Sequence, residues 1–126
     1  MKVLGLVWMG TRTDRFDETA AFFEGVMGLT LGESQDGFRE YTLPNADVVE
    51  LFSVDEPDHR HLDTGPVVGF LVSDIAAATA ELHAAGIELL GHTHSSNGYA
   101  WQHFRGPDGN VYEVVQDDRR VGAVGF

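Results

Sequence analysis

The sequence contains an internal repeat that limits the possible folds. The segment Gly28-Leu-Thr-Leu returns as Gly86-Ile-Glu-Leu, and Val49-Glu50-Leu51 returns as Tyr112-Glu113-Val114. The copies lie roughly 60 residues apart, and a nearly constant period indicates a duplicated structural unit. One copy alone would leave a sheet face bare, so we expect the two copies to bury it together.

Each copy has the pattern of a strand, a helix and three further strands. Apolar residues at helical spacing predict helices over 17–27 and 74–85, ended by Gly28 and Gly86. Asp17 and Ser73 are the expected N-caps. Runs of β-prone residues predict strands over 2–9, 29–31, 38–43, 47–52, 67–72, 87–90, 99–105 and 110–116.

These elements predict one α+β domain over residues 1–126. Two βαβββ modules are expected to form a curved eight-stranded mixed sheet, with the helices outside and a ligand cup inside. Module 1 spans 1–52 and module 2 spans 67–120. A polar linker with two prolines covers 53–66, and a short Gly-rich tail covers 121–126.

Composition excludes several classes of function. The chain has no cysteine, which excludes disulfides, thiolate metal sites and cysteine nucleophiles and fits a reducing cytoplasm. Its net charge of -12 argues against nucleic acid as a partner and permits a cationic ligand. The opening MKVLGLVWMG is too short to span a membrane and is predicted to be a strand, so no membrane partner is expected.

The stretch HFRGPDGNVYEVV raises the question of why an acid lies in an apolar strand. Pro107 and Gly109 suit a tight turn, which gives that turn a structural role. Glu113 follows it, and Glu50 occupies the corresponding place in the first copy. A buried carboxylate needs a partner, so each acid meets either an internal donor, with Arg39 and Arg105 the nearest candidates, or a group of a bound ligand.

Histidines offer a second possible site. His92 and His94 would lie on one side of an extended segment, and His103 could join them around a divalent ion. The alternative, which the polar run 95–98 favours, is a solvated loop that could act as a lid. His59 and His61 fall in the linker and are expected to be exposed.

Aromatic side chains on the strands are candidates for stacking on a planar or cationic ligand. His103 is added as a hydrogen-bond donor and Arg105 as a cation. The predicted ligand-binding set is Trp8, Tyr41, Phe52, Tyr99, Trp101, His103 and Arg105.

Three stretches together resemble the vicinal oxygen chelate superfamily, which includes glyoxalase I, extradiol dioxygenases, fosfomycin-resistance enzymes and bleomycin-resistance proteins. They are DETAAFFEGVMGLTL, VVGFLVSDIAAATAELHAAGIEL and FRGPDGNVYEVVQ. The resemblance implies a divalent ion held by one residue from the first strand (the early position) and one from the fourth strand (the late position) of each module. Glu50 and Glu113 occupy the two late positions. The early positions fall on Val7 or Trp8 and on Val67 or Val68, which cannot bind a metal. We therefore expect no metal and no cofactor, and the resemblance implies a homodimer.

Three functions remain open. The leading hypothesis is a metal-free protein that binds a small cationic or aromatic compound, such as a basic antibiotic. The second is a divalent-metal lyase or dioxygenase that uses Glu113 with His103 or His92. The third is a metal-free isomerase or cyclase in which Glu113 or Glu50 acts as the base.

Overall fold

The structure of the chain is a computed structural model that describes residues 1–121. The predicted tail therefore lies outside the described residues, apart from Val121, the last residue of α3. The elements in chain order are β1 (Val3–Thr13), α1 (Phe16–Ala21), the π-helical turn η1 (Phe22–Val26), β2 (Leu31–Gln35), β3 (Phe38–Thr42), β4 (Val48–Ser53), the 3-10 turn η2 (Pro57–His59), β5 (Val67–Val72), α2 (Ile75–Ala84), β6 (Glu88–Ser96), β7 (Tyr99–Arg105), β8 (Val111–Asp117) and α3 (Asp118–Val121).

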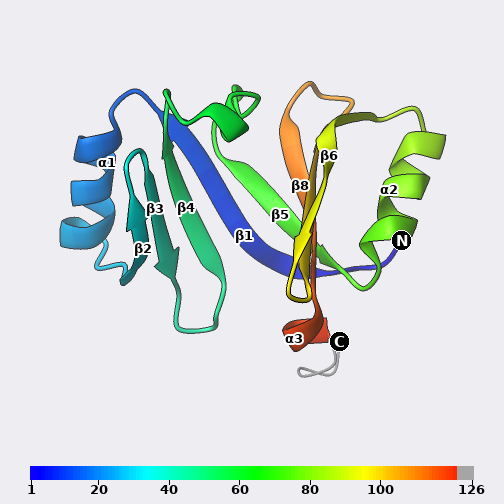
Figure 1. Ribbon diagram of the computed structural model, residues 1–126, viewed down its shortest axis with the longest axis horizontal. Helices are drawn as coiled ribbons and strands as arrows, with labels where there is room; N and C mark the ends of the chain where they lie inside the picture. The colour runs from blue at the N-terminus through cyan, green and yellow to red at the C-terminus, as the bar shows by residue number, and fades with distance from the viewer. Residues whose placement is uncertain (122–126) are drawn as a thin grey trace. The chain divides into compact units, whose positions relative to one another are not determined.

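The strands form one mixed sheet of eight strands in the order β2-β3-β4-β1-β5-β8-β7-β6 (Figure 1). The pairs β1–β4 and β5–β8 are parallel, whereas β2–β3, β3–β4, β6–β7 and β7–β8 are antiparallel. The sheet ends at β2 and β6, so it is not closed. The predicted α+β class and the eight-stranded mixed sheet are confirmed.

The chain divides into two compact units. The first unit is Trp8–Val67, and the second unit is Met1–Val7 together with the chain from Val68 onward. The N-terminal half of β1 therefore groups with the second copy of the repeat, although the sequence places it in module 1.

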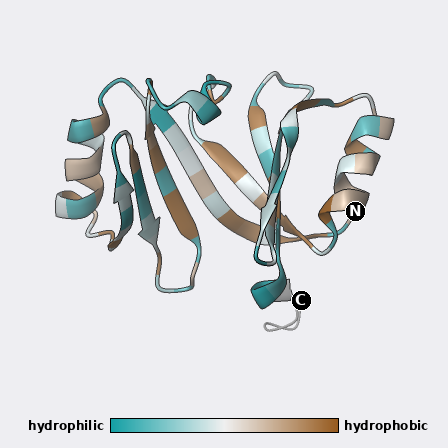
Figure 2. Ribbon diagram, viewed as in Figure 1, coloured by the Kyte–Doolittle hydropathy of each residue, from teal (hydrophilic) through white to brown (hydrophobic). Residues whose placement is uncertain are grey.

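Each unit packs its helix on one face of its own strands. In the first unit, Ala20 of α1 lies in a buried cluster with Tyr41, Val49 and Leu51. In the second unit, the buried residues of α2 pack against one residue from each of three strands: Ile75, Ala78 and Leu82 against Val72, Ala100 and Val114. Figure 2 shows β4 as mainly hydrophobic and the outer strands β2 and β3 as mainly hydrophilic, in line with this packing.

Several predicted boundaries are corrected. β1 continues to Thr13, and β6 continues to Ser96. Asp17 lies in the first turn of α1, where the N-cap is Arg15. The N-cap of α2 is Asp74 rather than Ser73, because Asp74 is the last extended residue and its Oδ1 accepts a hydrogen bond from the Ala77 amide at 3.1 Å.

Within residues 1–121, no helix has the length and apolar character needed to cross a membrane.

Candidate functional site

Strand alternation decides which predicted site residues share a face. Because successive side chains point to opposite sides of a strand, residues that alternate with the helix-packed ones lie on the other side, here called the helix-free face of each unit. The helix-free face of the first unit carries Trp8, Glu50 and Phe52. That of the second unit carries Tyr99, Trp101, His103, Arg105 and Glu113.

Tyr41 does not join this set. It is fully buried on the helix side of the first unit, with its ring 5.7 Å from that of Phe23. Its hydroxyl donates to Oε2 of Glu24 at 2.9 Å. Burial and this hydrogen bond raise the pKa of Tyr41 to about 12. The prediction that Tyr41 lines the ligand-binding face is therefore wrong. Along β3 it is Glu40 and Thr42, not Tyr41, whose side chains lie on the helix-free face.

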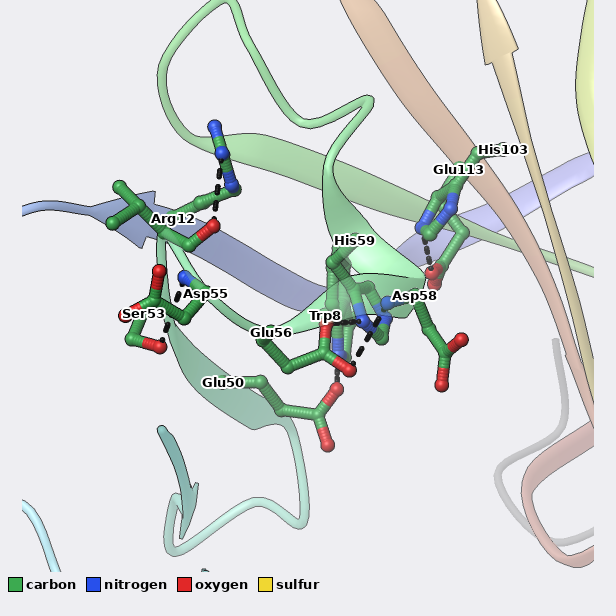
Figure 3. A network of polar contacts seen from close by, with 11 residues as sticks. Trp8, Arg12, Glu50, Ser53, Asp55, Glu56, Asp58, His59, His103 and Glu113 are labelled. Atoms are coloured by element: carbon green, nitrogen blue, oxygen red, sulfur yellow. Dashed lines mark hydrogen bonds and ion pairs between the residues drawn. The ribbon is translucent and has the colours of Figure 1, made fainter. Parts of the chain in front are cut away.

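Glu50 has an internal partner. The indole Nε1–H of Trp8 donates to Oε1 of Glu50 at 2.8 Å (Figure 3). The indole lies flat over Gly10, where a β-carbon would meet Cη2 of Trp8 at 2.0 Å. Gly10 is also the residue paired with Glu50 across the parallel β1–β4 ladder. A glycine at this position therefore makes room for the ring that reaches the carboxylate.

Glu113 and His103 form a buried acid–imidazole contact. Their residues are paired in the β7–β8 ladder, and Nε2 of His103 lies 2.9 Å from Oε2 of Glu113 (Figure 3). Their side chains are 1% and 3% exposed. Burial raises the pKa of Glu113 well above its usual 4.5. Burial, with a smaller contribution from the charge of His94, lowers the pKa of His103 to about 4. Both effects favour a neutral acid beside a neutral imidazole at pH 7.

The two acids have matching surroundings. Glu50 is paired with Gly10 on its parallel neighbour and with Glu40 on its antiparallel neighbour. Glu113 is paired with Gly69 on one side and with His103 on the other. The repeat thus preserves an acid beside a glycine, while the residue across the antiparallel ladder differs.

A row of aromatic rings leads toward the second acid. The ring of His94 stacks on Trp101 at 4.0 Å, and Trp101 lies 5.0 Å from His103. The ring of His92 stacks on His94 at 4.4 Å. The side chains of these two histidines are exposed, as the solvated alternative predicted, but they lie on the strand β6 rather than on a loop. The reason is a tight turn at Asn97 and Gly98, both with positive φ, which extends the β6–β7 hairpin to Ser96.

The linker histidine His59 is partly buried, although the sequence predicts an exposed side chain. Its ring stacks on Phe52 at 3.9 Å. Its Nδ1 lies 2.6 Å from Oε2 of Glu56 (Figure 3). Both side chains of this pair are only 15% exposed. Glu56 also accepts from the Asp58 amide at 3.3 Å and is the N-cap of η2. No feature of the sequence predicts that this polar segment folds back over Phe52, because its polarity resembles that of a solvated linker.

The two arginines predicted as partners of the acids both donate to backbone carbonyls. Arg39 donates to the carbonyls of Gln35 and Phe38 at 2.7 and 2.8 Å and lies over the ring of Phe16. Arg105 donates to the carbonyl of Gly109 at 2.8 Å.

The donor set does not fit the divalent-metal site that the resemblance implies. The indole N–H of Trp8 is a donor only and cannot bind a metal, and its hydrogen bond uses Oε1 of Glu50. The other early position is a valine, and Glu113 faces His103. In the chain up to residue 121, no group of three or more His, Asp or Glu side chains could hold a metal ion.

Several solved structures share this fold. One is a glyoxalase/bleomycin resistance protein/dioxygenase superfamily member from Vibrio splendidus. It is 22% identical to this chain with a TM-score of 0.67, and the match covers 90% of this chain and 99% of that one. Methylmalonyl-CoA epimerase from Mycobacterium tuberculosis is 24% identical with a TM-score of 0.66, over 91% and 89% of the two chains. A Mn(II)-bound glyoxalase from Novosphingobium aromaticivorans is 20% identical with a TM-score of 0.71, over 92% of this chain and 41% of that chain.

At these identities the structural matches establish the fold alone. No curated protein matches the chain. The family model described as Glyoxalase/Bleomycin resistance protein/Dioxygenase superfamily matches residues 5–114, which is most of the sequence. The chain therefore belongs to the glyoxalase/bleomycin resistance protein/dioxygenase superfamily.

Proposed function

We propose that the chain binds a small organic molecule without a divalent metal ion. The observation that carries this proposal is the hydrogen bond from Trp8 to Glu50 at 2.8 Å. It places an indole against a carboxylate that would otherwise be available to a metal. The buried Trp8 ring fills the place of a metal ligand, so that no open coordination site remains there.

Each helix-free face, taken by itself, carries groups that suit a planar or cationic ligand. Trp101 is partly exposed and stacks on His94 at 4.0 Å, which holds its ring in one orientation. Glu40 and Glu50 are direct cross-strand neighbours, and like charges so placed favour a positive group beside them. The net charge of -12 would attract such a ligand over long range. Sequestration of a basic antibiotic is the concrete form of this proposal.

The test uses the full chain after treatment with EDTA, with bleomycin as a cationic aromatic probe. We expect the probe to raise the melting temperature equally with and without added Zn²⁺, Mn²⁺ or Ni²⁺. Trp101→Ala should weaken binding. Tyr112→Phe is the matched control, since Tyr112 points to the helix side of β8. A stoichiometric metal that survives dialysis and is required for binding would contradict the proposal.

Glu113 favours a second candidate, metal-free proton transfer of the kind an isomerase performs. Its Oε1 is buried and, among residues 1–121, has no hydrogen-bond partner, and its pKa is raised well above 4.5. An acid with these properties can hold a proton at pH 7 and pass it on. Similarity to an epimerase structure is compatible with this candidate.

Glu113→Gln separates the two candidates. For a ligand that binds, loss of deuterium uptake from D₂O with retained affinity would support proton transfer. Unchanged binding with no uptake in either protein would leave binding alone as the function.

We also propose a homodimer. β2 is exposed along its whole length and ends the sheet, and such an edge is commonly covered by another chain. Sedimentation velocity at several concentrations tests this, and a monomer throughout would contradict it.

A further inference from the structure

Arg12 is a cation on the helix-free face of the first unit. It lies two residues after Gly10 on β1, so it shares a face with Trp8. Its ladder partner on β4 is Phe52, the ring on which His59 stacks. The sequence does not predict this placement, because the predicted first strand ends at residue 9 and Arg12 lies beyond it.

The guanidinium of Arg12 is incompletely satisfied. Its Nη2 donates to the carbonyl of Val54 at 3.1 Å (Figure 3). Its Nε is buried and has no hydrogen-bond partner among residues 1–121. A buried donor on a charged group usually has a partner, and the exceptions call for an explanation.

The charge of Arg12 is also uncompensated. Arg15, Arg105 and Arg119 each have a carboxylate within 4.0 Å, and the half-buried Arg39 instead donates to two backbone carbonyls. No carboxylate lies within 4.0 Å of Arg12 in the described part of the chain, although the protein has 20 acidic residues against 8 Lys and Arg. A half-buried cation without an internal anion, in so acidic a chain, points to an anion supplied from outside.

We propose that Arg12 recognises an oxyanion, a carboxylate or a phosphate, on the bound molecule. A guanidinium presents several N–H donors in a planar fork that matches such groups. This inference rests on the proposed binding function and narrows it. The ligand is not only planar or cationic but also carries an oxygen-based anion that reaches the end of β1.

The Nε–H group of Arg12 gives a direct readout. Uniformly ¹⁵N-labelled full chain in EDTA is titrated with inorganic phosphate in one arm and acetate in the other, with chloride holding the ionic strength constant. We expect the Arg12 Nε–H resonance, assigned by its absence in Arg12→Lys, to shift saturably with a dissociation constant on the order of millimolar. The arm that saturates at lower concentration identifies the preferred anion.

Two variants test the residue itself. Because neither variant has an Arg12 Nε–H group, both are followed through the backbone amide resonances that shift together with it in the wild type. Arg12→Met should abolish the saturable shift of these resonances, and Arg12→Lys, which keeps the charge without the fork, should weaken binding roughly tenfold. Arg15→Met is the matched control, because Arg15 is exposed and paired with Glu18. A dispersed spectrum verifies folding for each variant.

The outcomes separate this inference from the proposed function. Saturation that is lost in Arg12→Met supports the role of Arg12. Saturation that persists in Arg12→Met, or no saturation in the wild type with or without metal, overturns it. Saturation that appears only after a divalent ion is added, and that still requires Arg12, contradicts metal-independent binding but supports the role of Arg12.

Discussion

Nε2 of His103 lies 2.9 Å from Oε2 of Glu113, and both side chains are almost completely buried. Burial opposes charge on each of them: it raises the pKa of Glu113 well above 4.5 and lowers the pKa of His103 from 6.5 to about 4. A pair of this kind stores a proton without carrying a charge. Its two members therefore affect stability in opposite directions as pH changes.

Glu113→Gln should remove a loss of stability that grows with pH. Folded Glu113 keeps its proton at pH values above 4.5, where the unfolded chain has lost it, so the free energy of unfolding falls as pH rises. The advantage of the variant over the wild type should grow by up to about 1.4 kcal/mol per pH unit. Urea unfolding of both proteins from pH 5 to 8.5 measures this difference.

His103 has the opposite sign. It stays neutral in the folded chain between about pH 4 and 6.5, where the unfolded chain gains a proton, so its contribution is lost as pH falls through that range. In Glu113→Gln, which lacks the opposing contribution of Glu113, the free energy of unfolding should therefore fall as pH falls below 6.5. The exposed control Glu88→Gln should run parallel to the wild type, and parallel curves for Glu113→Gln as well would contradict the assignment.

Trp8→Phe should cost about 1–2 kcal/mol of unfolding free energy, because it leaves the Glu50 carboxylate without its indole donor. Glu50→Gln keeps an acceptor for Trp8 and should cost less. Chemical denaturation of the two variants gives the comparison. A loss in Glu50→Gln as large as that in Trp8→Phe would contradict this expectation, because the intact indole still has an acceptor in the amide oxygen.

Gly10→Ala should displace the ring of Trp8. The added β-carbon would lie 2.0 Å from Cη2 and 2.4 Å from Cζ2 of the indole, so the ring has to move. We expect a loss of about 1–3 kcal/mol and an altered tryptophan fluorescence spectrum. Gly5→Ala is the matched control, because nothing lies within 4 Å of its β-carbon position. An unchanged spectrum for Gly10→Ala would be inconsistent with the close approach.

Glu56→Ala should release the segment that covers Phe52. The change removes both the N-cap of η2 and the carboxylate 2.6 Å from Nδ1 of His59. A loss of about 1–2 kcal/mol is expected, together with a shift of the His59 ring protons in NMR spectra. The exposed neighbour Asp58→Ala serves as control. His59 signals that stay in place in Glu56→Ala would show that stacking on Phe52 alone positions the ring.

The sequence by itself determined the repeat, the fold class and the strands that carry Glu50 and Glu113. These follow from apolar periodicity and turn residues, which act over a few neighbouring positions. Strand alternation also placed Trp8, Phe52, Trp101 and His103 on the same kind of face. The exception, Tyr41, shows the limit of this approach, because a shift of one residue moves a side chain to the other face.

Only the tertiary structure decided which groups meet. Trp8 donates to Glu50 and His103 contacts Glu113, two contacts that charge alone did not suggest. His59 stacks on Phe52 although it lies in a segment whose composition resembles that of a linker. The surroundings of the Nε of Arg12, which is unpaired within residues 1–121, are set by contacts between β1 and the end of β4, which lie 42 residues apart in the sequence. Such contacts are set by ladder register and by the space that Gly10 leaves, and neither can be read from local composition.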